Sequence, residues 1–338
     1  MAIGRKMRNW GLAVLALAGC GQSTVQFVVV RPAVINVRDH GGSVSVLGFL
    51  PGQADYAEVA GQLKAEVIDH IANDVPGAVA LREFGGGVVV SGRVDDYGLS
   101  LAEGRRADKC SDTVKEGEGD AAVTKKVEVD CVQRWYDWIA HMAVAVQVTA
   151  ATGQILLLRP FVSETTGRGA ESRDVAPVPP NGHPLLQALR SQIAAGIANL
   201  VAPHKEQVSA VLYDCVAPAK DTCAAGVRLF AESRYDPAVE AFTQAIGLLS
   251  QAKADKADLA KAHWNRAIVF QYSRRFDEAL RDLAKANDLD ASDSYTRQQR
   301  EVERERALHL KLVEQGMAPI GPAAVPPPAA PVPAGSRP

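Results

Sequence analysis

The sequence is short of aromatic residues, of cysteine and of net charge. Phenylalanine, tryptophan and tyrosine make up only 6% of its 338 residues, a length that suits about two domains. The 37 basic and 39 acidic residues leave a formal charge of −2, so the chain lacks the basic surface of nucleic-acid-binding proteins. Five cysteines are too few for a small fold held together by disulfides. An apolar content of 47% excludes a wholly disordered chain.

The motifs of common catalytic and metal sites are also missing. The sequence has no Gly-x-Ser-x-Gly turn, no His-Glu-x-x-His zinc motif and no Gly-Lys-Ser/Thr phosphate loop. It has no Cys-x-x-Cys pair, and no histidine lies near a cysteine. We therefore predict a protein that is not an enzyme, with no catalytic residues, no metal ligands and no cofactor.

The first twenty residues contain the most specific motif in the chain. Arg5, Lys6 and Arg8 form a positive segment, which is followed by a short apolar stretch at residues 10–18. This stretch is too short to cross a hydrocarbon core of ~30 Å and fits the apolar region of a secretory signal. No later stretch approaches the length of a membrane-spanning helix.

The signal ends in Leu17, Ala18, Gly19 and Cys20, which resembles the lipobox of bacterial lipoproteins. The resemblance implies that Cys20 receives a diacylglycerol, that residues 1–19 are removed, and that residues 20–24 form a lipidated tether. It also implies a lipid-anchored protein of the cell envelope. Gly21 stands where an aspartate favours the inner membrane, so the outer membrane, facing the periplasm, is favoured. The alternative is an ordinary secretory signal followed by an incidental cysteine.

Residues 25–210 predict a first domain of the α+β class, in which helices pack on a sheet. Valine-rich or alternating runs predict strands at 25–30, 43–49, 79–84, 88–94 and 138–150. A turn at residues 152–153 predicts a hairpin that returns through residues 155–158. Apolar residues at helical spacing predict helices at 56–72 and 184–200.

Four pieces of this domain together resemble a family of envelope lipoproteins. They are Arg31-Pro32-Ala33 before a strand ending at Phe49, the long helix at 56–72, the segment at 90–97, and the strand at 144–149 that turns at 152–153. Over residues 25–202 the chain is similar to the periplasmic domain of curli-secretion lipoproteins (CsgG-type) and of penicillin-binding-protein activators (LpoB-type). The resemblance implies a binding or assembly domain without catalytic residues. Residues 99–135 carry 15 charges in 37 positions, which lipid-facing strands do not tolerate, so we predict no pore.

The second half of the chain carries an internal repeat. Its first copy consists of Gly226, Ala238, Phe242 and Ala245, and the second copy has Ala267, Ala279, Leu283 and Ala286 at the same spacing. Positions 4 and 3 residues apart share one helical face, and small residues there let two helices approach closely. Tyr235 and Phe276 hold equivalent positions in the turns. The pattern resembles the tetratricopeptide repeat, a helix–turn–helix unit. The alternative is two generic helical hairpins.

These repeats place an all-α domain at residues 211–316. A polar helix at 294–315 is expected to cap it, because two repeats are fewer than the ~3 that stability normally requires. Residues 317–338 are proline-rich, with eight prolines among the last twenty residues. That composition cannot build a core and predicts an extended, disordered tail.

Four cysteines remain if Cys20 carries lipid. In an exported protein they suggest two disulfides, for which three pairings are possible. We favour Cys110–Cys131 and Cys215–Cys223, because each pair flanks one polar segment. The first pair would close a hairpin extension and the second would fix the junction between the domains.

Together these features predict a non-enzymatic envelope lipoprotein that acts as a protein-binding or assembly scaffold. Its lipid would bind the membrane, and one of its domains would bind a protein partner of unknown identity. The alternative is a regulator of peptidoglycan synthesis that contacts a synthase, as LpoB-type proteins do, although the short tether counts against it. A secretion component of the CsgG type is the least favoured hypothesis. No nucleic-acid partner is expected.

Overall fold

The computed structural model describes residues 21–116 and 123–317. The signal, the lipobox with Cys20, and all of the proline-rich tail after Met317 lie outside the described residues. The chain divides into two compact units. The first, Ala33–Ala202, is called the α/β unit here. The second combines the described parts of Met1–Pro32 and Pro203–Pro338 and is called the helical unit.

The α/β unit is built on a mixed sheet with the strand order β3-β2-β4-β5-β6, and β7 pairs with β5. The strands are β2 (Ser43–Pro51), β3 (Ala80–Leu81), β4 (Val88–Glu116), β5 (Val123–Ala150), β6 (Ile155–Arg168) and β7 (Ser172–Arg173). β2 runs parallel to β3 and β4, whereas β4, β5 and β6 are antiparallel neighbours. The predicted hairpin at residues 152–153 is confirmed. The strand predicted at 79–84 is reduced to two residues, because only Ala80 and Leu81 pair with β2.

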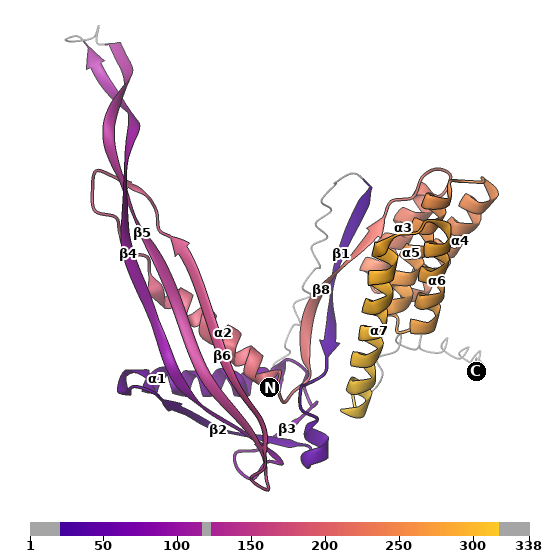
Figure 1. The fold of residues 1–338 in the computed structure, drawn as a ribbon, viewed down its shortest axis with the longest axis horizontal. Helices are drawn as coiled ribbons and strands as arrows, with labels where there is room; N and C mark the ends of the chain where they lie inside the picture. The colour runs from indigo at the N-terminus through magenta and orange to yellow at the C-terminus, as the bar shows by residue number, and fades with distance from the viewer. Residues whose placement is uncertain (1–20, 117–122, 318–338) are drawn as a thin grey trace, which may run out of the picture. The chain divides into compact units, whose positions relative to one another are not determined.

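Two helices cover one face of this sheet, α1 (Ala57–Asn73) and α2 (Gly182–Ala198) (Figure 1). On β5, Val144, Val146 and Val148 point into the core while the residues between them stay partly exposed, as alternation along a strand requires. Leu63 of α1 and Ile197 of α2 are completely buried against them. The helices predicted at 56–72 and 184–200 are therefore confirmed with small shifts of their ends.

The hairpin of β4 and β5 is far longer than predicted. The two strands pair from Val88↔Ala150 to Glu116↔Val123, with one shift of register between Val94 and Asp96. β6 pairs only as far as Asp137↔Arg168, and β7 ends its pairing at Gln133↔Arg173. Residues 107–116 and 123–132 therefore form a two-stranded ribbon beyond the sheet, which is called the arm here. Ten residues of strand span about 33 Å.

The helical unit begins with a strand that we predicted to belong to the first domain. β1 (Gln22–Arg31) pairs along its full length with β8 (His204–Tyr213), in an antiparallel two-stranded sheet. The helices are α3 (Lys220–Ala231), α4 (Tyr235–Gln251), α5 (Lys256–Tyr272), α6 (Phe276–Leu289) and α7 (Asp293–Glu314). The predicted boundaries of 25–210 and 211–316 thus differ from the observed units. The partner of β1 lies about 180 residues later in the chain, and no local sequence pattern reveals such a pairing.

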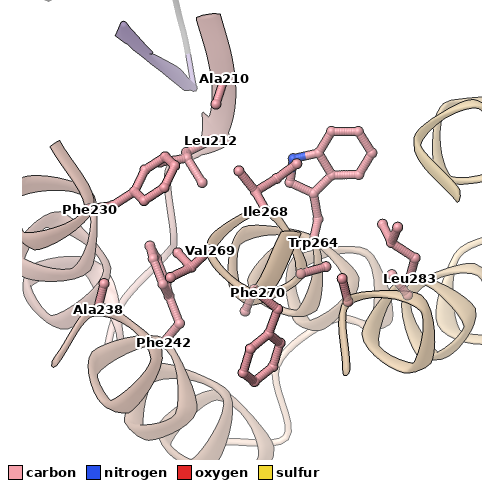
Figure 2. Close-up of a cluster of buried hydrophobic side chains, with 14 of the residues drawn as sticks. Ala210, Leu212, Phe230, Ala238, Phe242, Trp264, Ile268, Val269, Phe270 and Leu283 are labelled. Carbon is pink, nitrogen blue, oxygen red and sulfur yellow. The ribbon is translucent and has the colours of Figure 1, made fainter. Parts of the chain in front are cut away.

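One apolar core joins this strand pair to the helices. Val25 and Phe27 of β1 and Leu212 of β8 belong to the same buried cluster as the α3 to α6 side chains. Figure 2 shows Ala210 and Leu212 directed toward Phe230 of α3 and toward the α5 side chains. The unit is therefore a helical array with a β-ribbon built into its core, not the purely α-helical domain expected.

The packing of α3 on α4 gives a direct test of this core. A Cβ atom at Gly226 would lie 2.8 Å from the Phe242 ring, whereas at Gly247 of α4 it would meet nothing within 4 Å. We expect Gly226→Ala to lower the free energy of unfolding by about 1–3 kcal/mol, because a fully packed ring cannot give way. Gly247→Ala, the matched control, should raise it by roughly 0.5–1 kcal/mol through helix propensity. Urea unfolding of both variants measures the difference, and equal effects would contradict the packing.

Candidate functional site

The predicted repeat positions all lie at helix contacts of the helical unit. Ala238, Phe242 and Ala245 on α4 are completely buried, and so are Ala279, Leu283 and Ala286 on α6. Ala267 on α5 is buried, as is Gly226 on α3. Tyr235 and Phe276 are the first residues of α4 and α6. The two copies thus form two successive helical hairpins, and their small residues serve packing rather than chemistry.

A buried charge cluster joins the helices of the second hairpin, and the sequence analysis missed it. Asp282 of α6 accepts two hydrogen bonds of 2.7 Å from the Arg266 guanidinium and contacts Nδ1 of His263 at 3.0 Å. Burial raises the pKa of Asp282, but the bonds from Arg266 and then His263 outweigh it and hold that pKa below its ordinary value. His263 and Arg266 are one turn apart on α5, and this spacing was the available signal in the sequence. The cluster is a structural ion pair.

The four described cysteines form the favoured pairs. Cys110 is bonded to Cys131 with their Cα atoms 5.9 Å apart, and Cys215 to Cys223 with a separation of 6.0 Å. The first bond crosses the arm between β4 and β5. The second lies in the core of the helical unit, where it ties the segment after β8 to α3. As predicted, the first bond closes a hairpin extension. The second bond was expected at the junction between the domains and instead lies inside the helical unit.

The base of the arm is held by aromatic rings that lie over glycines. A Cβ atom at Gly104 would fall 2.3 Å from the Trp135 ring on the paired strand. The guanidinium of Arg168 lies 4.3 Å from the same ring and donates to Asp137 at 2.9 Å. Hydrogen bonds from Trp135 and then Arg168 lower the pKa of Asp137. This cross-strand packing joins β4, β5 and β6 at the base of the arm.

Apolar side chains gather on the sheet face that α1 and α2 leave uncovered. Pairing places Leu50, Leu158 and Val162 on the same side as Ala145, opposite to the buried valines of β5. These three side chains are 70%, 64% and 76% exposed. A cavity of about 630 Å³, lined in part by Leu47, Leu50 and Leu158, lies there. This surface is called the apolar sheet face, and exposed apolar patches of this kind often mark interaction sites.

The described part of the chain shows neither a metal-ligand cluster nor a membrane-spanning helix. Among residues 21–116 and 123–317 no three or more histidine, cysteine or acidic side chains are grouped as metal ligands. No helix in these ranges has the length and apolarity to span a membrane. Leu17, Ala18, Gly19 and Cys20 lie outside the described residues, and a single residue, Gly21, separates Cys20 from β1.

No family model and no curated protein matches this chain. Two solved structures are similar to parts of it. The N-terminal domain of stress-induced protein-1 (STI-1) from C. elegans is 13% identical, with 36% of this chain and 86% of that chain covered and a TM-score of 0.24. The dodecamer of a PelC variant from Paraburkholderia phytofirmans is 12% identical, with coverages of 53% and 98% and a TM-score of 0.25. At these TM-scores neither likeness supports an argument about fold or function.

The positions of the two disulfides predict different consequences of their removal. Replacing Cys110 and Cys131 by serine should open the arm alone, because the bond lies outside the core of the α/β unit. Replacing Cys215 and Cys223 should instead destabilise the helical unit by about 2–3 kcal/mol, the chain-entropy value for a loop of this size. Hydrogen exchange read by mass spectrometry separates the outcomes. Faster exchange throughout the α/β unit after loss of Cys110–Cys131 would contradict this account.

Proposed function

We propose that this chain is a lipid-anchored lipoprotein of the bacterial cell envelope that serves as a non-catalytic scaffold for a protein partner. The main support for the proposal is the state of the five cysteines. Four of the five are paired in disulfides, which persist in oxidising compartments outside the cytosol. The fifth is Cys20, at the end of an apolar signal segment, and it is the residue that the lipobox needs.

The position of β1 adds to this proposal. Lipid on Cys20 would be joined to the folded protein by Gly21 alone, because β1 starts at Gln22. Since β1 belongs to the core of the helical unit, the anchor would hold that unit at the bilayer surface. The tether expected at residues 20–24 would then be even shorter, and it would lead into the helical unit instead of the α/β unit.

The scaffold role is supported by surfaces suited to protein contact. The apolar sheet face exposes Leu50, Leu158 and Val162, and the arm presents a charged ribbon with exposed Val114 and Val132. Both lie in the α/β unit and not in the unit that the lipid would hold. Regulation of a peptidoglycan synthase remains the second candidate, and the nature of the partner decides between the two.

The anchor is tested by replacing Cys20. In a bacterial host, wild-type protein should sediment with membranes, and its mature N-terminus should be an acylated Cys20 by mass spectrometry. Cys20→Ala should lack the acyl chains and leave the membrane fraction, because three chains supply nearly all of the membrane affinity. The control Cys215→Ser/Cys223→Ser variant keeps the lipobox and should stay membrane-bound. A Cys20→Ala protein that remains on the membrane would refute the anchor.

The scaffold role is tested at the apolar sheet face. After crosslinking in intact cells, a defined envelope protein should copurify with the wild-type chain. Leu158→Ser/Val162→Ser should reduce its recovery at least tenfold, because each buried aliphatic side chain contributes about 1.5–3 kcal/mol. Val178→Ser, at an exposed apolar residue outside the helices and strands, is the control and should change nothing.

The identity of the captured protein distinguishes the two candidate functions. A peptidoglycan synthase would favour the regulator, and another envelope protein would favour the assembly scaffold. Equal recovery with the double variant and the wild type would contradict a role for the apolar sheet face.

A further inference from the structure

A cavity of about 640 Å³ lies within the helical unit, beside the turns that join its helix pairs. The end of β1, the α3–α4 turn, the α5–α6 turn and one face of α7 form its wall. Pro237, Phe276, Leu308 and Leu312 give this wall an apolar part. Its size falls in the range of pockets that enclose small organic ligands.

A buried amide in the cavity has no partner for its donors. The Gln271 side chain is only 2% exposed. Its Oε1 accepts a hydrogen bond of 2.6 Å from Nε2 of Gln298, but its own Nε2 has no hydrogen-bond partner among the residues that the structure describes. Buried donors are almost always paired in folded proteins, so this NH₂ group marks a place for an acceptor from outside.

An arginine in the same cavity has no acidic partner. Arg274 has a left-handed backbone with φ +66° in the α5–α6 turn and is half-buried. None of the described acids forms a salt bridge with it. The other cavity arginines are neutralised: Arg31 by Glu206 and Glu305, and Arg234 by Glu232. The cavity therefore holds one uncompensated guanidinium.

His309 supplies a third polar group at this place. It lies on α7, and its buried Nδ1 lacks a hydrogen-bond partner in the described residues. Burial, and then the Arg274 guanidinium, lower the pKa of His309 and so favour the neutral ring. A neutral imidazole can donate from Nδ1 without adding charge. Two buried nitrogens without a hydrogen-bond partner, on α5 and α7, and one guanidinium without a salt bridge, in the α5–α6 turn, thus line one cavity.

We propose that this cavity binds a small organic carboxylate with an apolar body. A planar guanidinium and an NH₂ group that line the same cavity can each donate hydrogen bonds to a carboxylate. One uncompensated cation suits a monoanion, while Glu305 and Asp236 in the same wall disfavour a phosphate with two charges. The apolar wall takes the body of the ligand. The site adds ligand binding to the scaffold and involves no covalent step.

Calorimetric titration of the full chain with 3-phenylpropanoate tests the proposal. Saturable binding with a 1:1 stoichiometry is expected, and the neutral 3-phenylpropanamide should bind at least tenfold more weakly. Arg274→Asn should weaken binding of the carboxylate about 10- to 100-fold, as loss of a charge-assisted hydrogen bond does. Asparagine tolerates the left-handed backbone, so this variant should fold, which circular dichroism checks.

Lys253→Asn is the matched control. Lys253 is an exposed cation that also has a left-handed backbone, with φ +52°, but it lies outside the cavity. Its replacement should leave the affinity unchanged. Undetectable binding at 10 mM, equal binding of acid and amide, or equal weakening by both variants would each overturn the proposal. None of these results bears on the Cys20 anchor, so the two proposals fail separately.

Discussion

The pairing of β1 with β8 is the interaction on which the rest of the structure depends. Ten residue pairs join the first described strand to a strand that begins at His204. The ladder buries Val25 and Phe27 against the helices. At its end, Arg31 forms ion pairs with Glu206 of β8 and Glu305 of α7. Because both ends of the α/β unit continue into this ladder, that unit is an insertion within the helical unit.

Local patterns in the sequence predicted much of the fold. The valine alternation at residues 144–148 and the helical spacing of α1 and α2 identified their buried faces, because each pattern follows the geometry of one element. The repeated spacing from Gly226 to Ala286 identified the helical hairpins for the same reason. The disulfide pairing also followed from position along the chain.

Features that depend on contacts between residues far apart in the sequence were not predicted. The partner of β1 is set by contacts across nearly the whole chain. The arm has charged residues on both strands, and only Val127, Val129 and Cys131 alternate with them. This short apolar pattern does not reveal the length of the arm. The Asp282 cluster and the cavity groups of Gln271, Arg274 and His309 come together only when separate helices meet. The sequence therefore located the packing residues but not the cavity.

The unit that the lipid would hold and the unit that would bind a partner are separate in this account. β1 would connect the anchor to the helical core, and the inserted α/β unit bears the apolar sheet face and the arm. Such a division lets a scaffold keep its membrane attachment while its binding surfaces vary. A ligand in the cavity beside β1 would contact α7, the α5–α6 turn and β1 at once.

Native-state hydrogen exchange of the full chain at increasing denaturant tests the role of β1 most directly. The account predicts that β1 amides bonded to β8 exchange through the same opening reaction as α5 amides, with the same free energy and the same denaturant dependence. If β1 instead exchanges together with β5 and α2, or without protection, the ladder is not part of the helical core. The proposed link between the lipid anchor and that core would then fail.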